Sequence, residues 1–154
     1  MADQDIILRL IVALACGGLI GLERRWRGHE AGPHTNALVA AGAALFVMAG
    51  IVMAGDAGAR FIAQVASGVG FLAGGVILRD GFHVRGLNTA GTIWCVAALG
   101  CLIGLGRMVV AIEATGVIII ANSLFHLVEH KFKIFTNEEE DAGNLKLMRK
   151  KRNP

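Results

Sequence analysis

Long apolar segments alternate with short polar ones along most of the chain. Each apolar segment has about the 20 residues that a helix needs to cross the hydrocarbon core of a bilayer. The polar segments between them are short, and together with residues 129–154 they carry most of the charges. We therefore expect an all-α, polytopic transmembrane helical bundle with five spans. The expected spans are residues 6–22, 36–54, 61–78, 87–105 and 108–128.

Small residues recur at helical spacing inside these segments. Glycine weakens a helix in water by about 1 kcal/mol relative to alanine, but in a bilayer it lets two helix backbones approach closely. We expect glycine faces to pack the bundle and to join copies of the chain in a homo-oligomer. The glycines with this spacing are Gly17 and Gly21, Gly70 and Gly74, and Gly100 and Gly104.

The composition agrees with a membrane protein built as one domain. Hydrophobic residues make up 55% of the 154 residues, tyrosine does not occur, and the mean hydropathy is +0.59. The N-terminus has Asp3 and Asp5 where a signal peptide has basic residues, so we expect a retained first helix. We expect a transmembrane domain over residues 1–128 and a charged, partly disordered cytoplasmic tail over residues 129–154.

The basic residues predict an orientation in the membrane. Twelve of the 15 Lys and Arg residues follow the first, third or fifth expected span, and Arg9, Arg60 and Arg107 lie toward the other side. Because cytoplasmic segments are enriched in Lys and Arg, we expect a periplasmic N-terminus and a cytoplasmic C-terminus. This distribution also explains the net charge of +3 without a nucleic-acid partner.

The sequence contains no pattern of catalytic or cofactor-binding residues. Cys16, Cys95 and Cys101 lie in apolar runs and lack the spacing of a metal or redox site. We therefore expect no enzymatic activity, no cofactor and no metal site.

Charged residues collect at the expected cytoplasmic face. Glu23 and Arg24 end the first span, and Asp80 and Arg85 lie in the loop after the third. They are either ordinary interfacial side chains that reach toward water, or an interhelical ion-pair cluster that also forms a recognition surface.

Uncharged polar residues also occur within the spans or at their ends. As hydrogen bonds between helices each would contribute about 0.6 kcal/mol. The alternative is that they line a small polar cavity, and we favour the structural interpretation. These residues are Gln64, Ser67, Asn88, Thr89 and Thr92.

Two stretches resemble a known family. Residues 17–46 read GGLIGLERRWRGHEAGPHTNALVAAGAALF, and residues 64–94 read QVASGVGFLAGGVILRDGFHVRGLNTAGTIW. Both are similar to the MgtC/SapB family of bacterial membrane proteins, and the likeness extends over about residues 5–128. It implies an inner-membrane protein linked to magnesium limitation, acid or phosphate stress and, in pathogens, virulence. It also implies a regulator that binds other membrane proteins, such as the ATP synthase, more than a pump.

The resemblance also bears on individual residues. Glu23 and Asp80 match family motifs, which favours the ion-pair cluster and recognition surface, and the first stretch adds Thr35 and Asn36 as candidates. His34 stands where the family usually has arginine, and LAGG at residues 72–75 replaces the usual LGAG. Many members continue into an ACT-like domain, which residues 129–154 are too few to hold.

A transporter or channel for Mg²⁺ or protons is the alternative function. Glu113 lies inside the fifth expected span, where a carboxylate is costly unless it is paired, wetted or protonated. Mg²⁺ requires several oxygen ligands in octahedral geometry, and Glu113 lies on the opposite side of the membrane from Glu23 and Asp80. The sequence therefore favours the regulator.

Overall fold

The computed structural model describes residues 3–54, 58–80 and 83–128, which form helices and one β-hairpin. The chain divides into two compact units, residues 1–117 and 118–154. The labelled elements belong to the first unit: α1 (Asp3–Trp26), α2 (Pro33–Ala54), α3 (Gly58–Gly74), β1 (Leu78–Asp80), β2 (His83–Arg85) and α4 (Leu87–Gly104). A further helix, Met108–Val128, follows α4.

The structure confirms the predicted class, a helical membrane bundle. Within the described residues, α1, α2, α4 and the helix Met108–Val128 are long and apolar enough to cross a membrane. The ends of α1 also follow helix electrostatics, because Asp3 and Asp5 lie in its first turn and Arg24 and Arg25 in its last. The helix α2 begins with Pro33, a residue favoured at the first helical position.

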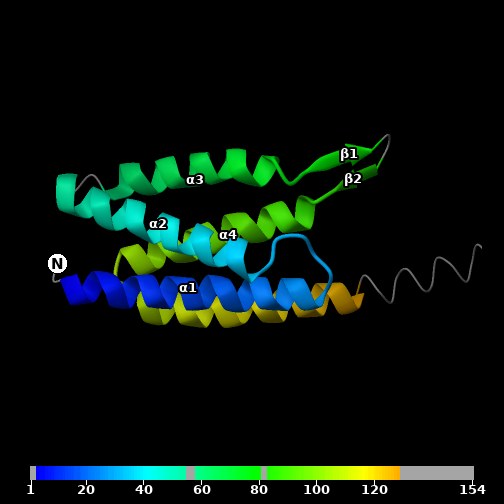
Figure 1. Cartoon of the computed structure of the whole chain (residues 1–154), viewed down its shortest axis with the longest axis horizontal. Helices are drawn as coiled ribbons and strands as arrows, with labels where there is room; N and C mark the ends of the chain where they lie inside the picture. The colour runs from blue at the N-terminus through cyan, green and yellow to red at the C-terminus, as the bar shows by residue number, and fades with distance from the viewer. Residues whose placement is uncertain (1–2, 55–57, 81–82, 129–154) are drawn as a thin grey trace, which may run out of the picture. The chain divides into compact units, whose positions relative to one another are not determined.

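The four labelled helices run alternately in opposite directions (Figure 1). The helix α2 packs against α1, α3 and α4, and α4 in turn packs against α1 and α3. Small and β-branched side chains fill the contact between α2, α3 and α4, so the helices pack closely there. These buried residues are Ala43, Val47, Val65, Ala97 and Cys101.

Glycines in the left-handed conformation end α1 and α4. Gly28 has a φ of 76° and Gly106 a φ of 82°. After α1, the N–H of His29 donates to the carbonyl of Arg24, and after α4 the N–H of Arg107 donates to that of Leu102. Both are Schellman motifs, which satisfy the last helical carbonyls and turn the chain back within a few residues.

The third span is shorter than predicted. We expected a helix over residues 61–78, but α3 ends at Gly74 and the chain enters β1 at Leu78. Its 17 residues extend about 25 Å, against about 30 Å for the hydrocarbon core of a bilayer.

A β-hairpin takes the place of the expected charged loop. In its antiparallel register Leu78 pairs with Arg85, Arg79 with Val84 and Asp80 with His83. The hairpin lies at the end of the first unit where α3 ends and α4 begins (Figure 1). The predicted tail, residues 129–154, lies outside the described residues, so its disorder stays a prediction.

Candidate functional site

A buried arginine joins the end of α1 to the start of α4. Arg24 is only 1% exposed. Its Nη1 donates to the Oδ1 of Asn88 at 3.4 Å, and its Nη2 donates to the Oγ1 of Thr89 at 3.2 Å. A hydrogen bond to a charged group stabilises a fold by about 1.5–3 kcal/mol. We call these three residues the Arg24 cluster.

Further polar contacts surround the Arg24 cluster. The Oγ1 of Thr92 donates to the backbone carbonyl of Asn88 at 3.0 Å, one turn back along α4. On α1, the buried carboxylate of Glu23 forms an ion pair with Arg27. Residues four apart are neighbours on the surface of a helix. Arg27 therefore holds the carboxylate of Glu23, the residue directly before Arg24.

The side chain of Asn36 is hydrogen-bonded to the loop between α1 and α2. Its side chain is fully buried, and its Nδ2 donates to the carbonyls of Ala31 and Gly32, both at 2.9 Å. The backbone of α1 can approach this point because Gly17 has no side chain. A Cβ at Gly17 would overlap the carbonyl oxygen of Asn36. The amide of Asn36 and the glycine of α1 therefore set how closely the first two helices approach.

The remaining predicted polar residues do not join this buried group. Thr35 is exposed at the start of α2, and Gln64 and Ser67 are exposed on α3. Thr89 and Thr92 are buried, so the predicted uncharged polar residues include both buried and exposed side chains.

The hairpin residues present a basic and apolar surface. Arg85 is exposed on β2, next to Val84, which is 48% exposed. Asp80 lies in β1, but its side chain is outside the described part of the chain, so its predicted pairing with Arg85 stays a prediction.

The six glycines singled out for helix packing divide into two groups. A Cβ at Gly17, Gly21, Gly100 or Gly104 would collide with the backbone of the α1–α2 loop or of α2. At Gly104, for example, it would lie 2.8 Å from the carbonyl oxygen of Ala44. Gly70 and Gly74 differ, because a Cβ at either would meet no described atom within 4 Å. Among the described residues, the contact we expected between their face of α3 and a neighbouring helix is therefore not made.

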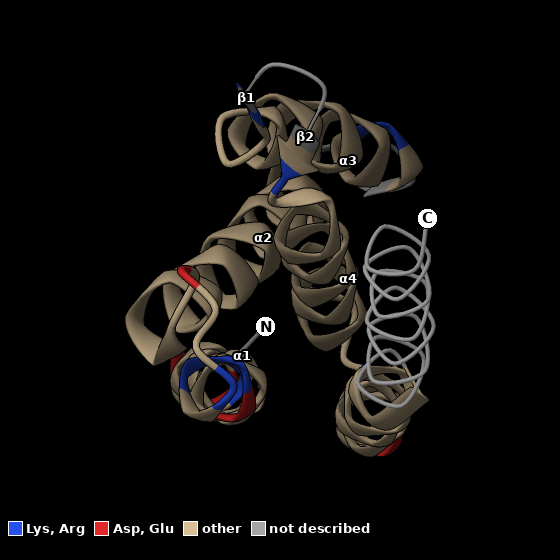
Figure 2. Ribbon diagram, turned by 90° about the vertical axis from the view of Figure 1, so that its right-hand side faces the viewer, with Lys and Arg blue, Asp and Glu red and all other residues tan. Residues whose placement is uncertain are grey.

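Charges are confined to certain elements of the bundle. The sequences of α2 and α4 contain no Lys, Arg, Asp or Glu, and both helices are drawn wholly in tan in Figure 2. Among the described residues of the first unit, charges lie on α1, at the start of α3, on the hairpin, in the loops and at Glu113 of the helix Met108–Val128. The buried guanidinium of Arg24 thus meets neutral partners on α4.

Comparison with known protein families assigns the chain to one of them. The MgtC family matches residues 10–131, which include the Arg24 cluster, Asn36 and the hairpin. The chain belongs to the MgtC family. No solved structure matches it.

Curated relatives extend this MgtC-family match. The chain is 52% identical over 118 residues to Protein MgtC of Salmonella typhimurium, covering 77% of the chain and 51% of that protein. It is 51% identical over 113 residues to Protein MgtC of Brucella abortus, covering 73% and 48%. An uncharacterized protein of Synechocystis is 50% identical over 123 residues, covering 79% and 53%. The chain therefore spans about half the length of the curated relatives it matches.

Two residues of this MgtC-family chain were missed by sequence reasoning. The Nη1 of Arg9 on α1 donates to the carbonyl of Gly104 at 2.7 Å, so a cation meets the C-terminal end of α4. The sequence did contain a signal for Arg9, because an arginine inside an apolar helix must find a polar partner. Arg27 was also missed as the partner of Glu23, although the spacing of four residues indicated it.

Proposed function

We propose that this chain is a bacterial inner-membrane regulatory protein that acts by binding another membrane protein. The proposed setting is adaptation to magnesium limitation and related stress, including virulence in pathogens, and the proposed partner is the ATP synthase or another transport or sensor protein. Membership of the MgtC family supports this proposal. We propose further that the chain has no enzymatic activity and works as a homo-oligomer.

The placement of the buried polar groups is the observation that carries the proposal. Among the described residues, the buried polar side chains of the first three spans and α4 belong to the end where α1 finishes and α2 and α4 start. They are Glu23, Arg24, Asn36, Thr89 and Thr92. Beyond them along α2 and α4, the core consists of residues such as Val47, Ala97 and Cys101. The four labelled helices thus have buried polar groups at one end and an apolar middle. The other described buried polar side chain is Thr115 on the helix Met108–Val128, and its hydroxyl donates to the carbonyl of Ala111 on the same helix.

The same placement weighs against the alternative, a Mg²⁺ or proton transporter. An ion that crosses about 30 Å of hydrocarbon needs water or replacement ligands along its path. The described residues hold no group of three or more His, Cys, Asp or Glu side chains placed to bind a metal ion. Glu113 is exposed on its helix, apart from the other carboxylates that we considered.

The hairpin is the surface that we propose for recognition. Leu78, Arg79, Val84 and Arg85 are all exposed on its two strands, and we call them the hairpin surface. Such a combination of cationic and apolar side chains suits a partner that presents acidic groups close to the membrane, because complementary charges favour encounter and fix orientation.

A growth assay with crosslinking tests this proposal. In cells that depend on this chain in low magnesium, we expect Arg85→Ala to slow growth and Arg107→Ala, an exposed arginine after α4, to leave growth normal. Both variants should reach the membrane in equal amounts, because neither side chain is buried. A photo-crosslinking residue at position 85 should capture a membrane protein severalfold more efficiently than one at position 107. Normal growth of Arg85→Ala with equal crosslinking at both positions would contradict the proposed surface.

A further inference from the structure

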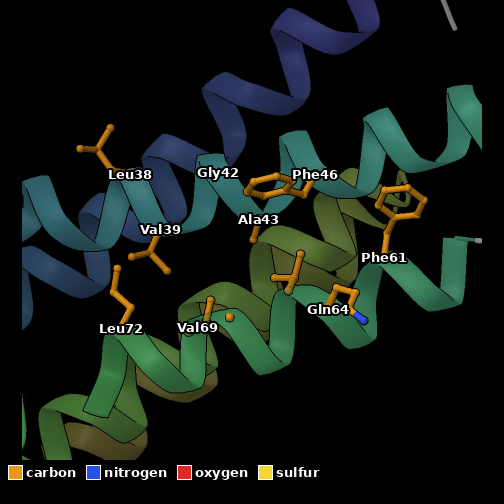
Figure 3. A pocket seen from close by; sticks show the side chains of 11 residues that line it. Leu38, Val39, Gly42, Ala43, Phe46, Phe61, Gln64, Val69 and Leu72 are labelled. Atoms are coloured by element: carbon orange, nitrogen blue, oxygen red, sulfur yellow. The ribbon is translucent and has the colours of Figure 1, made fainter. Parts of the chain in front are cut away.

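An open apolar groove runs between α2 and α3. Its volume is about 460 Å³. Leu38 and Phe46 form part of its wall on α2, and Phe61 and Leu72 mark its two ends on α3 (Figure 3). Phe46 is 64% exposed and Leu38 is 55% exposed, so the groove opens toward the surroundings of the bundle.

The length and the lining of the groove suit a hydrocarbon chain. Phe61 and Leu72 are about 16.5 Å apart along the axis of α3. Apart from Gln64, the described residues that line the groove are apolar or glycine. An extended acyl chain can therefore lie along it.

Two glycines leave the groove open. A Cβ at Gly42 of α2 or Gly68 of α3 would meet no described atom within 4 Å, and both residues line the groove. The packing of the two helices does not require glycine at either position, because an added Cβ would fit without moving the backbone. Side chains at these positions would, however, fill the space that a bound chain needs.

One end of the groove carries a polar side chain. Among the described residues that line it, Gln64 alone carries a polar side chain, and its amide lies beside Phe61 (Figure 3). Arg60, also exposed, precedes Gln64 by four residues and so lies on the same face one turn nearer the start of α3. An amide left without a partner in hydrocarbon costs several kcal/mol. Gln64 therefore requires a hydrogen-bond acceptor at this depth.

We propose that the groove binds one acyl chain of an anionic phospholipid. The guanidinium of Arg60 binds the lipid phosphate, an anion that arginine recognises through paired N–H donors. The Nε2 of Gln64 donates to an ester carbonyl about one turn deeper, and the acyl chain follows the groove toward Leu72. The order of groups along α3 (cation, amide, apolar groove) matches the order phosphate, ester and hydrocarbon in a phospholipid. The site is independent of the proposed regulatory function.

Native mass spectrometry of the purified protein in detergent tests the proposal. The probes are phosphatidylglycerol and a diacylglycerol with the same acyl chains, which lacks the phosphate. We expect the parent protein to bind phosphatidylglycerol at least tenfold more tightly than the diacylglycerol. Arg60→Gln should lose most of this preference and still bind both lipids. Gly68→Leu, which fills the groove, should lose both.

The matched control is Gly70→Leu, two residues along the same helix, where an added Cβ also meets no described atom within 4 Å. It should bind both lipids as the parent does. Equal binding by Gly68→Leu and Gly70→Leu would overturn the proposal, as would a parent protein that does not discriminate between the two lipids. A change in the oligomeric state of Gly68→Leu without loss of lipid would also overturn it, because the groove would then belong to a contact between copies.

Discussion

At the scale of single residues, glycine has two different roles in this chain. Where α4 crosses α2, a Cβ at Gly100 would overlap the carbonyl oxygen of Ala40 and lie 2.8 Å from the Cβ of Ala43. At Gly91, on the same helix, it would meet no described atom within 4 Å. The glycine at the crossing is required by the distance between two backbones, and the other is not.

A matched pair of substitutions in α4 separates these roles. We expect Gly100→Ala to lower the free energy of unfolding by about 1–3 kcal/mol, because the added methyl group overpacks the contact with α2. Gly91→Ala should leave it unchanged or raise it by up to about 1 kcal/mol, because alanine is the better helix former. Unfolding of both variants in detergent micelles measures the difference, and equal stabilities would show that the close approach of α2 and α4 is not needed.

The sequence alone could not tell which glycines make contacts. Gly70 and Gly74 have the same spacing as Gly100 and Gly104, yet within the described part of the chain only the second pair lies against another helix. In a soluble protein, polar residues mark the face that points to solvent, but the face of a membrane helix that points to lipid is as apolar as the face that packs.

Polar residues were easier to place from the sequence. A buried polar group must find a partner, which is why Arg24, Asn88 and Thr89, all predicted candidates, lie together. Their pairing with one another was not predicted, since spacing along the chain does not show which helix ends meet. The hairpin surface was likewise predicted only as a charged loop.

At the scale of secondary-structure elements, the ends of helices were harder to predict than the helices themselves. The predicted span 61–78 reads as one apolar run, but the paired glycines Gly74 and Gly75 favour a turn at this point. The hairpin register leaves two residues between Asp80 and His83, the commonest loop length for a hairpin.

The alternating directions of the helices give a test of orientation. The hairpin lies where α3 ends and α4 begins, and Arg107 follows the opposite end of α4. In a variant with Cys16, Cys95 and Cys101 replaced by alanine, a membrane-impermeant maleimide added to intact cells should label Arg107→Cys and spare Arg85→Cys. This result follows from the excess of Lys and Arg on the hairpin side. The reverse labelling pattern would contradict the predicted cytoplasmic C-terminus.

At the scale of the whole molecule, the proposed regulator and the alternative transporter differ in what the apolar middle must do. A regulator needs a stable bundle and a surface, which the glycine contacts, the Arg24 cluster and the hairpin surface can supply. A transporter needs a polar path through residues such as Val47, Ala97 and Cys101, which are buried in the core. The apolar core of these helices therefore supports the proposal of a regulator.

Magnesium flux through the purified protein in liposomes tests this account most directly. With a magnesium-sensitive dye inside the vesicles, and an established magnesium transporter as a positive control, we expect no Mg²⁺ entry above that of empty liposomes. Entry that saturates with Mg²⁺ concentration and is abolished by Glu113→Gln would contradict the account and establish the transporter in its place.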